Sequence, residues 1–129
     1  MHTGVNYMYM KGREFMGSVN KGQRWMFAVD ADTSAPSDGV RREVLAYSDD
    51  AMCVAHHFEK GAVGALHNHP HTQITYVAEG IFEFDIDGEV KTVKKGDTML
   101  KTDSVMHGCK CLEKGTLVDF FTPMREDFV

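Results

Sequence analysis

The chain has few cysteines and no cluster of positive charge. Cys53, Cys109 and Cys111 are odd in number and two of them lie one residue apart, which is not the pattern of a disulfide framework. The 14 Lys and Arg residues are interspersed among 19 Asp and Glu residues, for a net charge of −5. Because nucleic acids and anionic membrane surfaces bind clustered cations, we expect neither as a partner.

Long apolar runs are also missing from the sequence. No run reaches the roughly 18 apolar residues of a transmembrane helix, and the first 25 residues lack the basic start and apolar core of a secretory signal. With the cysteine pattern, this predicts a cytoplasmic location. An acidic small molecule would need a local cationic site on such a chain, either a metal ion or a buried arginine.

The pattern of apolar residues predicts an all-β domain. The 129 residues, 43% apolar and 26% charged, are typical of one globular domain. From Val40 onward, short runs rich in β-branched and aromatic residues alternate with glycine-centred turns, and no stretch keeps a helical period. We expect a sandwich or barrel with strands at 52–58, 74–78, 81–86, 89–93, 107–112 and 117–121, and a hairpin turn at Asp87-Gly88.

The N-terminal third has weaker signals. Glycines interrupt residues 1–22, which we interpret as an irregular arm, and the composition of residues 31–39 favours a loop. Trp25, Phe27 and Val29 alternate with other residues, which predicts a packed strand. We therefore divide the chain into an arm and loop at 1–39 and a barrel domain at 40–129.

Three of the seven histidines fall between Leu66 and Thr72. In a strand, His67 and His69 would share one face, roughly 6.6 Å apart at about 3.3 Å per residue. Gln73 could join them through its carbonyl oxygen if the chain bends at Pro70, and His107 could arrive from a later strand. The spacing alone leaves two interpretations, a metal site or histidines in a surface loop.

The glycine frame around these residues is more specific. Gly61, His67, His69, Gln73 and Gly80 resemble the first motif of the cupin superfamily, which usually has Glu in place of Gln73, and Gly96 followed by His107 resembles the second. Thr102 and Ser104 stand where the second motif usually has Pro and Gly. The resemblance covers about residues 40–122. It implies a double-stranded β-helix barrel that holds one divalent transition metal, which could be zinc, nickel, iron, manganese or copper.

A closer resemblance is to the KdgF family of pectin-degradation proteins. It rests on EKGAVGALH at 59–67, PHTQI at 70–74 and TPMREDF at 122–128. The family is characterised by the Gln ligand, so the resemblance implies that the metal is held by His67, His69, Gln73 and His107. It also implies ring opening of 4,5-unsaturated monouronates, which are small anionic sugars, to linear keto-aldehyde acids. Asp119, Phe121 and Arg125 would match the active-site pattern Asp-x-Phe-x-x-x-Arg.

Alternation places Asp119 inside the barrel, where an ionised group needs a partner or a function. It could pair with Arg125 and so fasten the C-terminus, or the two could serve as an acid/base group and a carboxylate clamp. His56 and His57 have two interpretations, a partly buried position at the rim of the barrel or a contact with a substrate. We expect His71 near the surface or beside the metal ligands, and Cys109 and Cys111 in the core.

Two other functions are compatible with these residues, a metal-dependent dioxygenase and a barrel that binds a sugar acid without turnover. Dioxygenase activity would need a redox metal and consume oxygen, whereas ring opening is redox-neutral. By analogy with small barrels of this fold, we expect a homodimer.

Overall fold

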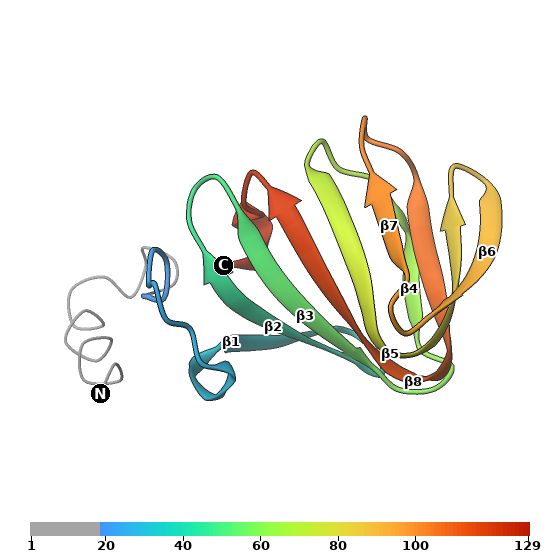
Figure 1. Cartoon of the computed structure of the whole chain (residues 1–129), viewed down its shortest axis with the longest axis horizontal. Coiled ribbons are helices and arrows are strands. Elements are labelled where there is room, and N and C mark those ends of the chain that lie inside the picture. The colour runs from blue at the N-terminus through green and yellow to red at the C-terminus, as the bar shows by residue number, and fades with distance from the viewer. Residues whose placement is uncertain (1–18) are drawn as a thin grey trace.

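A computed structural model describes residues 19–129, which form an antiparallel all-β structure (Figure 1). No helix in this part of the chain is long and apolar enough to cross a membrane. The elements in chain order are η1 (Ala28–Asp30), β1 (Asp32–Ser37), β2 (Val40–Tyr47), β3 (Met52–Phe58), β4 (Val63–His67), β5 (Thr72–Ile86), β6 (Glu89–Lys94), β7 (Thr98–Lys101), β8 (His107–Thr122) and η2 (Glu126–Phe128).

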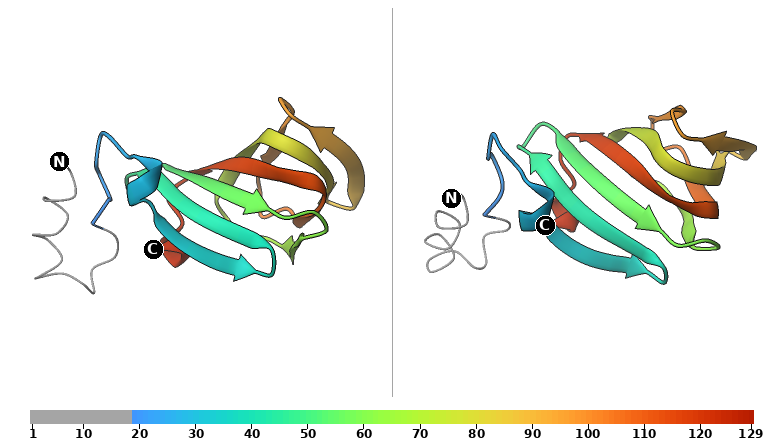
Figure 2. Two further views of the ribbon diagram at one scale, coloured as in Figure 1. Left: turned by 90° about the horizontal axis from the view of Figure 1, so that it is seen from below. Right: turned by 60° about the horizontal axis from the view of Figure 1, so that its bottom comes forward.

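The two long strands, β5 and β8, pair with each other along nearly their whole length and join two sheets. In one sheet the first half of β5 pairs with the second half of β8. β7 lies on the other side of β5, and β3, followed by β2 and β1, lies on the other side of β8. The remaining halves pair with β6 and β4. The views in Figure 2 show how this sheet curls over itself, which is the arrangement expected of a double-stranded β-helix.

The passage from one sheet to the other depends on two glycines. The register of β5 against β8 shifts between Val77 and Phe82, and Gly80 and Gly115 lie at this crossing. Gly80 has φ +85, and a Cβ atom there would lie 2.6 Å from backbone atoms of the β8 crossing. A Cβ atom at Gly115 would meet the carbonyl oxygen of Glu79. The strands can therefore bend together only where both residues lack side chains.

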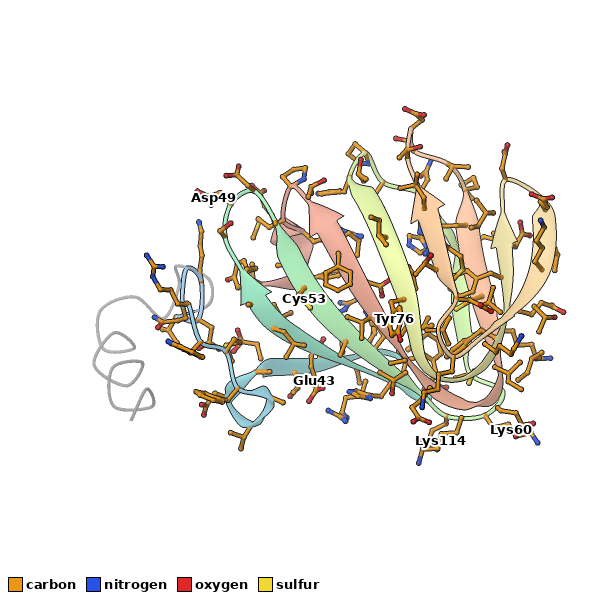
Figure 3. The ribbon with its side chains drawn as sticks, in the orientation of Figure 1. Glu43, Asp49, Cys53, Lys60, Tyr76 and Lys114 are labelled. Carbon is orange, nitrogen blue, oxygen red and sulfur yellow. The ribbon has the colours of Figure 1, made fainter. Side chains whose placement is uncertain are left out.

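Side chains alternate between the barrel interior and the outer face, as the pleat requires. Cys53 and Tyr76 lie on the outer face of β3 and β5 (Figure 3). The interior holds two apolar clusters, one built around Phe58, Phe82 and Leu117 and the other around Val54 and Phe121. Polar side chains from β2, β3, β5 and β8 lie between the clusters, and this polar layer contains the candidate site.

Most of the predicted strands are confirmed. The strand at 52–58 is β3, and the turn at Asp87-Gly88 has φ 54 and 81, as a hairpin of this type needs. Two long strands each contain two of the predicted ones. β5 contains the strands predicted at 74–78 and 81–86, and β8 contains those predicted at 107–112 and 117–121. The turn-like residues between them accommodate the bend without ending the strands.

Two predictions in the N-terminal third were wrong. The predicted loop at 31–39 contains β1, which pairs with β2 although all six of its residues are exposed. An edge strand tolerates Pro36 because one side of it needs no hydrogen bonds. The segment with Trp25 and Val29 forms no strand; it includes η1, and these side chains are 76% and 88% exposed. β1 occupies the free edge of β2, so this segment has no strand partner there. Residues 1–18 of the predicted arm lie outside the described residues, and the division at residue 39 stays a prediction.

We expect Gly80→Ala to destabilise the barrel far more than Gly88→Ala. Both glycines have a similar positive φ, which costs an alanine about 1 to 2 kcal/mol. A methyl group at Gly88 would meet no atoms within 4 Å, whereas one at Gly80 would face backbone at 2.6 Å. Crowding should add about 1 to 3 kcal/mol for Gly80→Ala. Urea unfolding would measure this difference, and equal losses of unfolding free energy would refute the role given to the crossing.

Candidate metal centre and active site

Three histidines and one glutamine converge in the barrel. His67 ends β4, His69 lies in the connection to β5, Gln73 is on β5 and His107 begins β8. The candidate ligand nitrogens of the three histidines lie within 4.8 Å of one another. His69 is therefore not in a strand as the spacing argument assumed, yet its ring still approaches that of His67, with 5.7 Å between centroids.

The hydrogen bonds of the rings leave Nε2 of His67 and of His107 free for a metal, whereas Nε2 of His69 faces the side-chain oxygen of Gln73. The Nδ1 atoms of His67, His69 and His107 lie 2.7, 3.2 and 3.0 Å from backbone carbonyl oxygens, those of Ala65, His71 and Val105. A carbonyl can only accept, so in His67 and His107 Nδ1 carries the proton and Nε2 presents a lone pair. His69 has a carbonyl oxygen beside each nitrogen, and it presents a lone pair on Nε2 in the tautomer that donates to His71. Carbonyl partners of this kind orient metal-binding imidazoles.

His107 supports this interpretation most directly. Its Nε2 atom is buried and has no hydrogen-bond partner among residues 19–129. Burial lowers the pKa of His107 to about 4, so the ring is neutral at neutral pH and its lone pair is available. A buried nitrogen without a partner is costly, and a metal ion would satisfy it.

Gln73 completes the donor set with an oxygen atom. Its Oε1 atom lies 2.9 Å from Nε2 of His69, which holds no proton when Nδ1 donates to His71. Burial lowers the pKa of His69, so a second proton on this ring is disfavoured. Two lone pairs then face each other, an arrangement that a shared cation would stabilise. Three imidazoles and an amide oxygen fit a divalent transition metal.

The amide of Gln73 is oriented by Asp119. Its Nε2 atom donates to Oδ1 of Asp119 at 2.8 Å, so its oxygen must point the other way, toward the histidines. Rotating the amide would bring its oxygen against an ionised carboxylate. The prediction that Gln73 reaches the site through its carbonyl oxygen therefore has a physical cause 46 residues further along the chain.

Asp119 is 3% exposed and accepts hydrogen bonds on both oxygens. Thr75 and Gln73 donate to Oδ1, and Nδ1 of His56 donates to Oδ2 at 2.7 Å. Burial alone would raise the pKa of this carboxyl group, but His56, Lys101 and Thr75 hold it well below its usual range. The group is therefore an anion inside the barrel.

Lys101 is a second buried charge that the sequence analysis did not assign to the site. Its side chain is 2% exposed, and its Nζ atom donates to the hydroxyl of Thr75, which in turn donates to Asp119. Burial lowers the pKa of Lys101, and the charge of Asp119 opposes that effect. The lysine thus stabilises the carboxylate through one hydroxyl group.

His67, Gln73 and His107 line a cavity of about 360 Å³ together with Asp119, Phe121 and Arg125. The ring of His69 lies beside this cavity, against the ring of Phe121, with 5.7 Å between centroids. The proposed ion pair between Asp119 and Arg125 is not what holds the C-terminus. Instead, Arg125 donates from Nε and Nη2 to both oxygens of Asp127, at 3.0 and 2.8 Å. Its guanidinium also lies over the rings of Phe121 and Phe128, at 5.1 and 4.3 Å.

The structure places the remaining candidate residues in different parts of the barrel. His56 faces the cavity, whereas His57 lies on the outer face and bonds to Thr116 and Glu43. His71 adjoins the ligands, since its carbonyl oxygen is the partner of His69. Cys111 is buried in the core, as predicted.

Three residues of the polar layer were missed, and two of them had a signal in the sequence. Thr75 follows Gln73 by two positions in one strand, and Arg42 lies between Val40 and Val44, which are both buried. Period-two alternation places each on the inner face. Lys101 had no such signal, because the apolar neighbour Leu100 is 61% exposed while the charged side chain is buried.

The loop before His107 departs from the second cupin motif in composition, and two of its residues have a backbone conformation that glycine favours. Ser104, which stands where glycine is typical, has φ 56, and Asp103 has φ 58. Both lie in the left-handed region that glycine favours. The carbonyl oxygen of Ser104 accepts a hydrogen bond from Asn68, between the first two histidines, and this bond ties the loop to the ligand segment.

Comparisons with known proteins agree with this fold. The family model of the cupin domain matches residues 54–120. The pectin degradation protein KdgF of Dickeya dadantii (strain 3937) is 47% identical over 94 residues, which cover 71% of this chain and 86% of that protein. An RmlC-like cupin from Shewanella frigidimarina NCIMB 400 has a TM-score of 0.79 at 36% identity, over 83% of this chain and 96% of the other. KdgF from Halomonas sp. has a TM-score of 0.78 at 33% identity, over 83% and 99%.

We expect His107→Ala to lower the affinity for Zn²⁺ or Ni²⁺ by more than about a hundredfold, because loss of a mere partner of a ligand already costs about 10- to 100-fold. His57→Ala is the matched control, since His57 lies on the outer face of the same barrel. Metal content after loading and dialysis measures the effect. Equal metal retention by the two variants would exclude His107 from the site.

Proposed function

This chain belongs to the cupin superfamily and, within it, to the KdgF family, and from that premise we propose that it opens the ring of 4,5-unsaturated monouronates. The products would be linear 5-keto-4-deoxyuronates, from sugars released in pectin or alginate degradation. One observation carries the proposal. His67, Gln73 and His107 line one cavity with Asp119 and Arg125, and the ligand nitrogen of His69 lies within 4.8 Å of those of the other two histidines.

In this proposal His67, His69, Gln73 and His107 hold one divalent transition metal, which could be zinc, nickel, iron, manganese or copper. The bound ion would supply Lewis acidity that stabilises negative charge on a substrate oxygen. All four donors are neutral, so the charge of the ion is not cancelled by its ligands and attracts an anionic sugar. The nearest carboxylate, that of Asp119, lies one hydrogen bond behind Gln73.

Asp119 is the group to which we assign the proton transfers. It is held as an anion, so it can accept the proton of the anomeric hydroxyl while the bond between C1 and the ring oxygen breaks. The electrons of that bond pass to the ring oxygen, which becomes an enolate oxygen on C5. A carboxyl group with a low pKa is a weak base but a strong acid, so the proton is readily passed on to C4. The aldehyde at C1 and the ketone at C5 then form without net oxidation.

Arg125 and Phe121 would bind the sugar. A guanidinium suits a carboxylate, and that of Arg125 is held in place by Asp127 and by stacking on Phe121. The ring of Phe121, 2% exposed, would form an apolar wall for the sugar. The cytoplasmic location and the homodimer stay predictions.

The test is an assay with lyase-generated unsaturated galacturonate, in which loss of the conjugated absorbance and oxygen uptake are followed together. We expect accelerated loss of absorbance without oxygen consumption. A rate no faster than the spontaneous one would refute the proposal. Oxygen uptake would indicate a dioxygenase instead, and tight binding without turnover would indicate a sugar-acid-binding barrel.

We expect Asp119→Asn to lose about 10²- to 10⁴-fold in turnover, the usual contribution of a general acid or base. The variant should keep its metal, because the side-chain oxygen of asparagine can still accept the hydrogen bond from Gln73. Asp49→Asn is the matched control, because that carboxylate is exposed and pairs only with Lys21 among the described residues. Turnover and metal content are measured on the same preparations. Full activity of Asp119→Asn would remove this residue from the mechanism.

A further inference from the structure

Arg42 is a cavity residue that the proposed mechanism leaves without a role. Its side chain points inward from β2, between the buried side chains of Val40 and Val44, and lines the cavity that holds the candidate metal ligands. Arg41, the preceding residue, points to the outer face and pairs with Glu43. The chain therefore turns one of two adjacent arginines into the cavity.

The contacts of Arg42 orient its guanidinium and leave its end open. Its Nε atom donates to Nε2 of His56 at 3.0 Å, and its Cζ atom lies 3.6 Å from the centre of the Phe128 ring. The two terminal nitrogens have no hydrogen-bond acceptor among residues 19–129. A guanidinium held by Nε and by stacking presents both terminal nitrogens to a ligand in a fixed orientation.

Arg125 offers less. Its Nε and Nη2 atoms already donate to the two carboxylate oxygens of Asp127. The two-point contact that a planar carboxylate prefers is thus taken by a residue of the chain itself. Of the two cavity arginines, Arg42 has the pair of donors available for a second carboxylate.

The charges near Phe128 favour an anion. The guanidinium groups of Arg42 and Arg125 both lie over this ring, at 3.6 and 4.3 Å from its centre. Burial, and then the charge of Arg125, lower the pKa of Arg42, so the two cations oppose each other. Asp127 neutralises one of them, and a bound anion would neutralise the other.

We propose that Arg42 binds the carboxylate of the substrate through its two terminal nitrogens and so selects uronic acids over neutral sugars. The inference rests on the proposed function, and it assigns the main carboxylate contact to Arg42 and a supporting one to Arg125. The bond from Arg42 to His56, which continues to Asp119, then links the carboxylate-binding residue to the proposed proton-transfer group.

The test compares the binding of two stable probes to the metal-loaded protein, D-galacturonate and D-galacturonamide, which share the sugar ring and differ in whether C6 is a carboxylate or an uncharged amide. Calorimetric titration gives a ratio of affinities for the acid and the amide. We expect Arg42→Gln to lower this ratio by about ten- to a hundredfold, the range expected for hydrogen bonds to a charged group. Arg41→Gln, on the outer face, should leave it unchanged.

The alternative role for Arg42 is to position His56 without contacting the substrate. In that case Arg42→Gln would slow turnover but weaken acid and amide alike, and an unchanged ratio would overturn the inference. If Arg42→Gln does not fold, as judged by metal content and unfolding midpoint, Arg42→Lys replaces it. The ratio should then fall less, since lysine offers no planar pair of donors, and an unchanged ratio again overturns the inference.

The outcomes also separate the inference from the proposed function. If the wild-type protein does not open unsaturated galacturonate, the proposed function fails whatever the ratios are. If it opens the sugar and the ratio of Arg42→Gln equals that of the wild type, only the role of Arg42 fails.

Discussion

The carboxylate of Asp119 sits in the interior of an apolar barrel, where an ion without partners would cost several kcal/mol. Its hydrogen bonds from His56, Thr75 and Gln73 meet that cost. Each donor is thereby held in one orientation. The amide of Gln73 must turn its oxygen toward the histidines, and His56, which donates from Nδ1, must accept from Arg42 at Nε2. The direction of the Gln73 oxygen and the proposed substrate contact of Arg42 both follow from satisfying one buried charge.

The strand pleat explains why these polar groups lie at one level of the barrel. On β2, β3 and β8 the inward residues read Val40-Arg42-Val44, Val54-His56-Phe58 and Leu117-Asp119-Phe121. Each polar residue lies between two apolar ones, so a polar layer separates the two apolar clusters. Arg42, Lys101 and Arg125 face the carboxylates of Asp119 and Asp127 in the cavity lining, so cations exceed anions there within a chain of net charge −5. The proposed acidic sugar would need such a local excess of positive charge.

The sequence predicts those parts of the fold in which alternation and burial agree. β3 and the turn at Asp87-Gly88 could be located because an apolar face and a positive-φ residue each leave a local signal. β1 could not be located, because all six of its residues are exposed and no apolar residue alternates with a polar one. Lys101 was missed for the opposite reason, since its neighbour Leu100 breaks the pattern by facing solvent.

The candidate site, like the fold, was predictable from the sequence only in part. By itself the sequence determined the kinds of ligand, the spacing of His67, His69 and Gln73, and the glycines that let β5 and β8 bend. Only the tertiary structure decided that Asp119 would meet Gln73, 46 residues away, and His56, 63 residues away. Turns and alternation depend on neighbours along the chain, whereas these contacts depend on the register of strands from distant segments. Asp119 meets His56 through the register of β3 against β8 and Gln73 through that of β5 against β8, and the second register shifts at the bend near Gly80 and Gly115.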